Sequence, residues 1–214
     1  MKGGELGDDL AAMGDLVARF SKIGEPILKN FLSAIVAGRG PMRVLDVGCG
    51  SGAFLQSIHK ANGSTTGFGL DIDAAAVRQA KDNIIAWGLE DSFSILQGDI
   101  RQLPEEIAGP FDLITLFNIL YYFDGEGLTE LLHKVRTMLA PRGVLAIAMN
   151  CHSQGVDAGA ANLNIVNCSL KGLTPLPPRE EIIALLKHCA FAKIDTHRFI
   201  PGSTFYGFVA RNCA

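Results

Sequence analysis

The chain has 214 residues, of which 48% are apolar, 19% are charged and 24 are glycine. This composition excludes a disordered chain, which would be poor in apolar residues and strongly charged. With 19 basic and 22 acidic residues, the net charge is −3, so the chain lacks the basic surface with which nucleic-acid-binding proteins neutralise phosphates. The length suffices for one domain with a full core and a small appendage.

The sequence also bears on location. No apolar run approaches the roughly 18 residues that a bilayer-spanning helix needs, and the first ten residues are acidic, whereas a signal peptide is basic and then apolar. The five cysteines are scattered and form no C-x-x-C pair, a pattern that favours reduced thiols over disulfides or a zinc site. We therefore expect a cytoplasmic protein with no membrane partner, no nucleic-acid partner and no metal.

Two helices are predicted at the start of the chain. An apolar stripe from Leu10 to Phe20 indicates the first, and Pro26 suits the first turn of a second that ends near Gly38. We expect residues 1–41 to form a helical cap. This cap could cover a binding site, pack on the remaining domain (residues 42–214), or contact a partner subunit in a homodimer.

From residue 42 onwards, short apolar runs alternate with helical stretches, as in βαβ units with a mostly parallel sheet between helices. The pattern predicts strands at residues 44–47, 65–70, 93–97, 111–117 and 144–149, and helices at 53–60, 74–87, 127–139 and 179–190. Two final strands, 193–199 and 204–210, are separated by a turn that can join only antiparallel neighbours. The prediction is a doubly wound α/β fold. The nearly uncharged, unusually long segment 150–178 is predicted to be a loop that could serve as a lid or acceptor wall.

The strongest local signal is the loop Gly48-Cys49-Gly50-Ser51-Gly52, which directly follows an apolar strand. Glycines allow positive φ and close approach of a ligand, and the helix that follows offers free N–H groups. In doubly wound sheets, ligands bind at this end of the strands. The loop therefore predicts a ligand site, although Gly-x-Gly alone does not separate one cofactor from another.

Three aspartates lie at the carboxyl ends of three predicted strands and make the interpretation more specific. Asp46 precedes the glycines, where its charge would repel a pyrophosphate and attract an ammonium group. Asp71 is placed to accept hydrogen bonds from two ribose hydroxyls, and Asp99 from an exocyclic amine. Ile72 and Ile100 would then enclose a flat base. A nicotinamide oxidoreductase is consequently the weakest of the hypotheses that we keep.

The chain resembles the class I S-adenosylmethionine-dependent methyltransferases over roughly residues 42–211. The resemblance rests on segments 44–52, 67–73, 96–100, 111–114 and 139–145. It implies a Rossmann-like, seven-stranded sheet with a reversed last strand. It also implies that the methionine moiety is held by Asp46 and the 48–52 loop, the ribose by Asp71 and the adenine by Asp99 with Ile100, and that Phe117 and Asn118 line the methionine side. Cys49 belongs to the same loop and is expected mainly to fill space.

The sequence says less about the methyl acceptor than about the cofactor. The chain lacks the Asn/Asp-Pro-Pro-Tyr sequence of enzymes that methylate nucleobase amines, which favours a small-molecule acceptor. The second half resembles small-molecule O-methyltransferases, but Tyr121 stands where those enzymes have a histidine base, so O-, N- and C-methylation all stay open. Tyr121 and His152 are the catalytic candidates. The alternative is a protein that binds S-adenosylmethionine, or its product S-adenosylhomocysteine, without turnover.

Overall fold

A computed structural model describes residues 14–152, 158–169 and 172–212. Its centre is a seven-stranded sheet in the order β3-β2-β1-β4-β5-β7-β6. Strand β7 runs antiparallel to both of its neighbours, and all other neighbouring pairs are parallel. The strands are β1 (Met42–Val47), β2 (Thr65–Asp71), β3 (Phe93–Gln97), β4 (Phe111–Phe117), β5 (Leu139–Asn150), β6 (Phe191–Arg198) and β7 (Phe205–Asn212). The predicted doubly wound α/β fold with a reversed last strand is confirmed.

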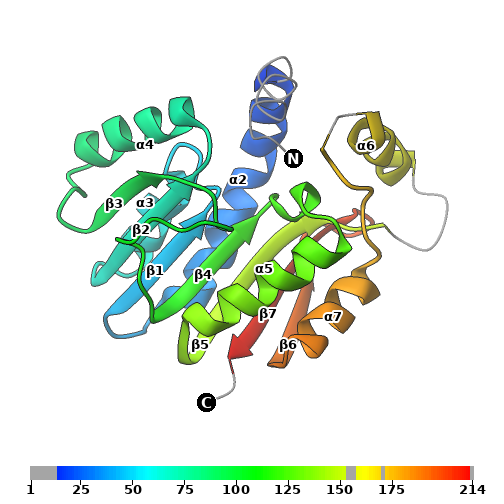
Figure 1. Cartoon of the computed structure of the whole chain (residues 1–214). Helices are drawn as coiled ribbons and strands as arrows, with labels where there is room; N and C mark the ends of the chain where they lie inside the picture. The colour runs from blue at the N-terminus through cyan, green and yellow to red at the C-terminus, as the bar shows by residue number, and fades with distance from the viewer. Residues whose placement is uncertain (1–13, 153–157, 170–171, 213–214) are drawn as a thin grey trace.

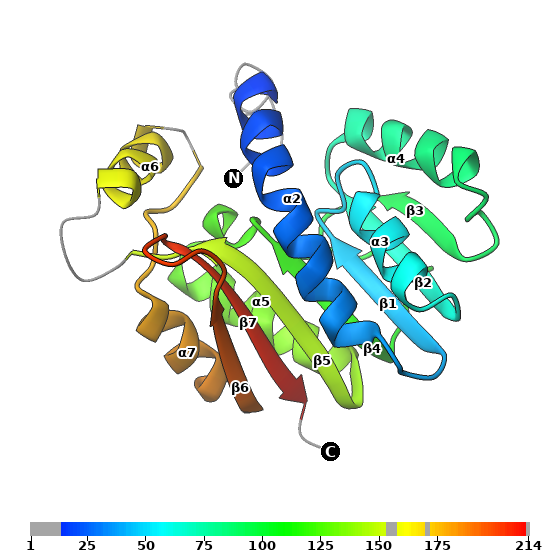
Figure 2. The same ribbon diagram turned by 180° about the vertical axis from the view of Figure 1, so that it is seen from behind.

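Helices cover both faces of the sheet (Figures 1 and 2). One face carries α2 (Gly14–Val36), α3 (Ala53–Ala61) and α4 (Ala74–Ala86), and the other carries α5 (Gly125–Met138) and α7 (Arg179–His188). Strand β4 is buried from both sides, as expected for a central parallel strand. Side chains of neighbouring residues therefore enter opposite cores: Leu113 packs in the core that contains α2, and Ile114 in the core that contains α5.

The first helix differs from the prediction. The described part of the chain has one continuous helix, α2, which runs through Pro26, rather than two helices separated near that residue. A proline inside a helix removes one backbone N–H donor and crowds the carbonyl four residues before it, yet α2 is helical on both sides of the exposed Pro26. Leu10 and Met13, which begin the predicted stripe, lie outside the described residues.

The segment 150–178, predicted to be a loop, also differs, because it contains helix α6 (Ala158–Ser169). This helix stands beyond the edge at which the parallel strands end, as does the N-terminal half of α2 (Figures 1 and 2). Two of its asparagines hold it to the chain that follows: Asn164 Oδ1 accepts from the Leu176 N–H at 2.8 Å, and Asn167 Nδ2 donates to the Thr174 carbonyl at 3.3 Å.

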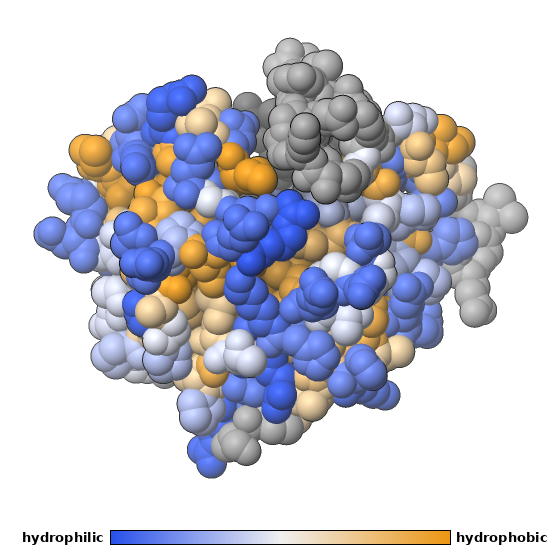
Figure 3. Space-filling model, viewed as in Figure 1, coloured by the Kyte–Doolittle hydropathy of each residue, from blue (hydrophilic) through white to orange (hydrophobic). Residues whose placement is uncertain are grey.

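The surface is mixed in character. On the face shown in Figure 3, apolar side chains appear in patches among polar ones. Within the part of the chain that the structure describes, the exposed large apolar side chains lie far apart in the sequence, at Ile72, Ile85, Ile165 and Ile200. Among the described residues, no helix has the length and apolar character needed to cross a membrane.

Strand β2 carries one glycine that the sheet requires. Gly67 has φ +149°, and a Cβ at this position would lie 1.9 Å from the Val44 carbonyl oxygen on the neighbouring strand. We predict that Gly67→Ala lowers the free energy of unfolding by about 3 kcal/mol or more, because backbone rather than a flexible side chain must move. Urea denaturation would measure this loss. Gly63→Ala, with no atom within 4 Å of the added Cβ, is the control; equal midpoints for the two variants would contradict the prediction.

Candidate cofactor site

The glycine loop and the predicted acids gather at one edge of the sheet. Strands β1, β2 and β4 run in parallel, and Val47 pairs with both Leu70 and Leu116. Their carboxyl ends therefore lie side by side, and the loop between β1 and α3 begins at this edge. It is the edge at which doubly wound sheets bind their ligands.

The loop is tightly held to the end of β2. The N–H groups of Gly48 and Cys49 donate to the Leu70 carbonyl at 2.7 and 3.1 Å. Gly48 has φ +72°, and a Cβ there would lie 2.5 Å from Ile119 Cγ2. At Gly50, with φ +51°, no atom lies within 4 Å of an added Cβ. The loop is thus closely packed at Gly48 and open at Gly50, where a ligand can approach the backbone.

Asp71 organises the same edge. Its Oδ2 accepts from the Gly50 N–H at 2.8 Å and its Oδ1 from the Asp73 N–H at 3.0 Å. A carboxylate has about four lone-pair positions, so Asp71 can still accept hydrogen bonds from a ligand. Asp73 caps α4 by accepting from the Ala75 N–H at 2.7 Å.

Asp46, the last but one residue of β1, is buried with an exposed fraction of 1%. Its Oδ1 accepts from the Thr115 hydroxyl at 2.5 Å, whereas its Oδ2 has no hydrogen-bond partner among the described residues. Burial raises the pKa of this carboxyl to about 7, against the lowering effect of the Thr115 hydrogen bond, and the charge of Asp71 adds to the rise. A cationic group beside Asp46 would stabilise its ionised form.

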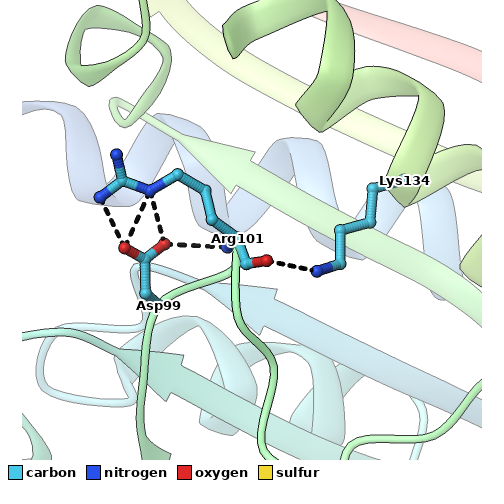
Figure 4. Close-up of polar contacts among 3 residues, drawn as sticks. All are labelled: Asp99, Arg101 and Lys134. Carbon is cyan, nitrogen blue, oxygen red and sulfur yellow. Dashed lines mark hydrogen bonds and ion pairs between the residues drawn. The ribbon is translucent and has the colours of Figure 1, made fainter.

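Asp99 follows β3 by two residues and is bound by Arg101 (Figure 4). The guanidinium contacts both carboxylate oxygens, and Nη2 lies 2.5 Å from Oδ2. Burial raises the pKa of Asp99, but the hydrogen bonds and charge of Arg101 outweigh burial and lower it. The carboxylate is therefore ionised and already paired.

The two isoleucines predicted to enclose a base have different environments. Ile72 is 54% exposed, next to the end of β2, whereas Ile100 is 4% exposed and belongs to the core on the α5 side. Cys49 is buried, and its Sγ would lie 2.9 Å from a Cβ added at Gly69. Burial also raises the pKa of the Cys49 thiol. Its packing agrees with the expectation that it fills space.

Phe117 is the last residue of β4, and Asn118 follows it. Phe117 is buried, with its ring 5.2 Å from that of Phe54 and 6.2 Å from that of Phe31. Asn118 has φ +56°, a conformation that asparagine tolerates better than most residues, and its N–H donates to the Ala148 carbonyl at 2.8 Å. Backbone strain of this kind concentrates at functional sites.

The two catalytic candidates have contrasting positions. Tyr121 is buried, its hydroxyl donates to the Asn150 carbonyl at 3.3 Å, and it accepts from the Asn150 N–H. Burial raises the pKa of this hydroxyl well above its usual value. His152 is exposed after β5, and its N–H donates to the Pro177 carbonyl at 2.8 Å. Tyr122 is half-buried, and both burial and the charge of Asp71 raise its pKa.

Two site residues were missed by the sequence analysis. Thr115 interrupts the apolar run of β4, and this interruption was a signal that a buried polar group needed a partner. Arg101 stands two residues after Asp99, but arginines near acids are so common on protein surfaces that this spacing alone does not predict an ion pair.

Asp46 should make stability depend on pH. Its pKa is about 7 in the folded chain against 3.8 as the ordinary value, so between these values the folded state binds one proton more. The stability present below about pH 4 is then lost as the pH rises through about 7. We predict that, between pH 4.5 and 8, wild type loses on the order of 3 kcal/mol relative to Asp46→Asn. Urea denaturation across this range tests it, with exposed Asp195→Asn as the charge control. Parallel curves for wild type and Asp46→Asn would contradict it.

The hydroxyl of Tyr121 should matter for stability. In Tyr121→Phe the partly buried Asn150 N–H loses its acceptor, which we expect to lower the free energy of unfolding by about 1–3 kcal/mol. Tyr122→Phe removes the hydroxyl of a half-buried residue one position further on, and it should lower the free energy of unfolding by less. Denaturation midpoints of the two variants measure the difference, and an unchanged midpoint for Tyr121→Phe would show that this hydrogen bond contributes nothing.

Comparison with known proteins agrees with this architecture. Residues 44–143 match the methyltransferase domain family. The release factor glutamine methyltransferase of Rhodospirillum rubrum is 34% identical over 138 residues, covering 53% of this chain and 41% of its own. The demethylspheroidene O-methyltransferase of Cereibacter sphaeroides is 30% identical over 137 residues, which cover 63% of this chain and 35% of that protein.

Among solved structures, an O-methyltransferase family protein from Burkholderia thailandensis superposes with a TM-score of 0.77 at 18% identity, covering 95% of this chain and 59% of its own. The chain thus spans less than two thirds of the length of each of these proteins. The shared features are the seven-stranded sheet with its reversed strand and the family match over the glycine loop and the acids. Residues 44–143 thus match a methyltransferase domain, and the chain shares its fold with the O-methyltransferase family protein.

Proposed function

We propose that the protein binds S-adenosylmethionine and transfers its methyl group to a small-molecule acceptor, leaving S-adenosylhomocysteine. The main support for this proposal is the environment of Asp46. Asp46 is a buried carboxylate at the base of the glycine loop with one oxygen unpaired among the described residues. A buried carboxylate without a cationic or hydrogen-bonding partner is costly, and the ammonium group of the methionine moiety would supply that partner.

The other residues at this edge fit the remaining parts of the cofactor. Asp71 would bind the ribose hydroxyls through its free lone pairs, and Asp99 would accept from the adenine amine, with Ile72 and Ile100 beside the base. The open backbone at Gly50, together with Gly48, Cys49 and Gly52, would face the methionine moiety. On its other side this moiety would meet Phe117 and Asn118 at the end of β4.

The chain's own contribution to catalysis is mainly positioning. The cofactor supplies a methyl group on a positively charged sulfur, which an acceptor attacks in line, so proximity and orientation provide most of the acceleration. A general base is needed only where the acceptor must lose a proton. Tyr121 suits that role poorly, because its hydroxyl is engaged by Asn150 and its pKa is raised. The exposed His152 is the better candidate for an acceptor that carries a proton.

The acceptor side favours an uncharged molecule. Helix α6 contains no charged residue, and it stands beyond the carboxyl edge of the sheet, as does the N-terminal half of α2 (Figures 1 and 2). A charged acceptor would need a counter-ion in its binding site, and α6 supplies none. We therefore place the acceptor among small molecules that are neutral around the methylated atom.

A cofactor-binding protein without turnover is the second candidate. It is favoured by the engagement of the Tyr121 hydroxyl, which leaves the position of the family's base without a free proton acceptor. Incubation with methyl-labelled S-adenosylmethionine and a broad panel of small acceptors separates the two functions. A single labelled product establishes the transferase, whereas binding without any product across the panel supports the second candidate.

Asp71 gives the direct test of cofactor binding. We predict that wild type binds S-adenosylhomocysteine in isothermal titration calorimetry and that Asp71→Ala weakens this binding by about 1–3 kcal/mol, or roughly 5- to 150-fold. Asp71→Asn, which retains one acceptor oxygen for the Gly50 N–H, should lie between the two. Asp195→Ala, on β6, controls for the lost charge. Absence of binding by the wild type would refute the proposed function, and unchanged affinity in Asp71→Ala would refute the ribose assignment.

A further inference from the structure

The carboxylate that the proposed function assigns to the adenine amine is already occupied by a side chain of the protein (Figure 4). Nε of Arg101 lies 3.0 Å from Oδ1 and 2.9 Å from Oδ2 of Asp99, and Nη2 lies 2.5 Å from Oδ2. The Arg101 N–H also donates to Oδ1, at 2.9 Å. Four donor contacts from one residue thus use both carboxylate oxygens. An amine in the plane of this carboxylate would meet the guanidinium.

The backbone of Arg101 is fixed, whereas its side chain is not enclosed. Lys134 on α5 donates from Nζ to the Arg101 carbonyl oxygen at 2.8 Å, and Gln102 donates its N–H to the Asp99 carbonyl at 2.9 Å. The side chain of Arg101 is nevertheless 56% exposed and that of Asp99 27%. The guanidinium can therefore leave the carboxylate by side-chain rotation alone, without displacement of the turn.

The guanidinium of Arg101 also contacts an aromatic ring that follows β4. Its central carbon lies 5.9 Å from the centroid of the Phe123 ring, within the range of a cation–π interaction. Phe123 follows the short helix η1 (Leu120–Tyr122), which comes after β4, whereas Asp99 follows β3. Arg101 thus joins two loops that border the same edge of the sheet.

We propose that Arg101 acts as a latch on the adenine subsite: its guanidinium competes with the cofactor's adenine amine for Asp99 and must turn away when the cofactor binds. This proposal rests on the proposed function. An exposed ion pair contributes little to stability, so the latch lowers the apparent affinity for the cofactor without preventing binding. If the open form makes up a fifth to a half of the population, the apparent dissociation constant is raised roughly 2- to 5-fold.

Calorimetric titration with S-adenosylhomocysteine tests the latch through a double-mutant cycle. Arg101→Met keeps the length of the side chain and removes the donors, and Arg39→Met, at an exposed turn, controls for the loss of one positive charge. We expect Arg101→Met to bind about 2- to 5-fold more tightly than wild type and Arg39→Met to equal wild type. Asp99→Asn should bind more weakly than wild type, and adding Arg101→Met to Asp99→Asn should change nothing further.

The outcomes separate the latch from other roles of Arg101. Weaker binding by Arg101→Met in both backgrounds would mean that Arg101 contacts the cofactor, and weaker binding only with Asp99 present would mean that it orients Asp99. Either result overturns the latch, as does equal affinity of Arg101→Met and wild type or an unchanged affinity in Asp99→Asn. In all these cases wild type still binds, and the proposed function stands. Absence of binding by wild type and Arg101→Met alike overturns both.

Discussion

The hydrogen bond from the Gly50 N–H to the Asp71 carboxylate is the contact on which the arrangement of the site depends. It joins the glycine loop after β1 to the end of β2, and the Leu70 carbonyl reinforces the junction by accepting from Gly48 and Cys49. Because β1 and β2 are parallel neighbours, their carboxyl ends lie level with each other. The Asp71 carboxylate at the end of β2 can therefore reach the loop that follows β1. These hydrogen bonds hold the loop in place, so a ligand that binds there would not have to offset the full entropy of ordering it.

The buried acid beneath this loop works against stability. Asp46 has one hydrogen bond, from Thr115, and its second oxygen has no partner among the described residues. Asp71 lies close enough for its charge to raise the pKa of Asp46 further. A core built for stability alone would have an apolar residue at this point of β1, as at the neighbouring Leu45 and Val47. A cationic ligand beside Asp46 would offset both the desolvation and the repulsion.

Sequence reasoning succeeded where local pattern and topology act together. The strands 93–97 and 111–117 were predicted with their observed bounds, because apolar runs flanked by polar residues, glycine and proline define both ends. The acids were placed at one edge because parallel strands end there. Helix α6 was missed because its alanines and asparagines lack an apolar period of 3.6 residues. The pairing of Arg101 with Asp99 and the burial of Ile100 depend on side-chain directions after β3, which the sequence does not specify.

The hydrogen bonds around residue 121 explain why a tyrosine fits this position. Its hydroxyl is joined to the Asn150 backbone at the end of β5, and its carbonyl accepts from both N–H and Oγ1 of Thr174, at 2.7 and 3.1 Å. The Thr174 carbonyl in turn accepts from Asn167 on α6. Tyr121 therefore connects the sheet to the helix beyond its edge. The Tyr121 hydroxyl is thus engaged in a structural contact, whereas His152, two residues after Asn150, is exposed.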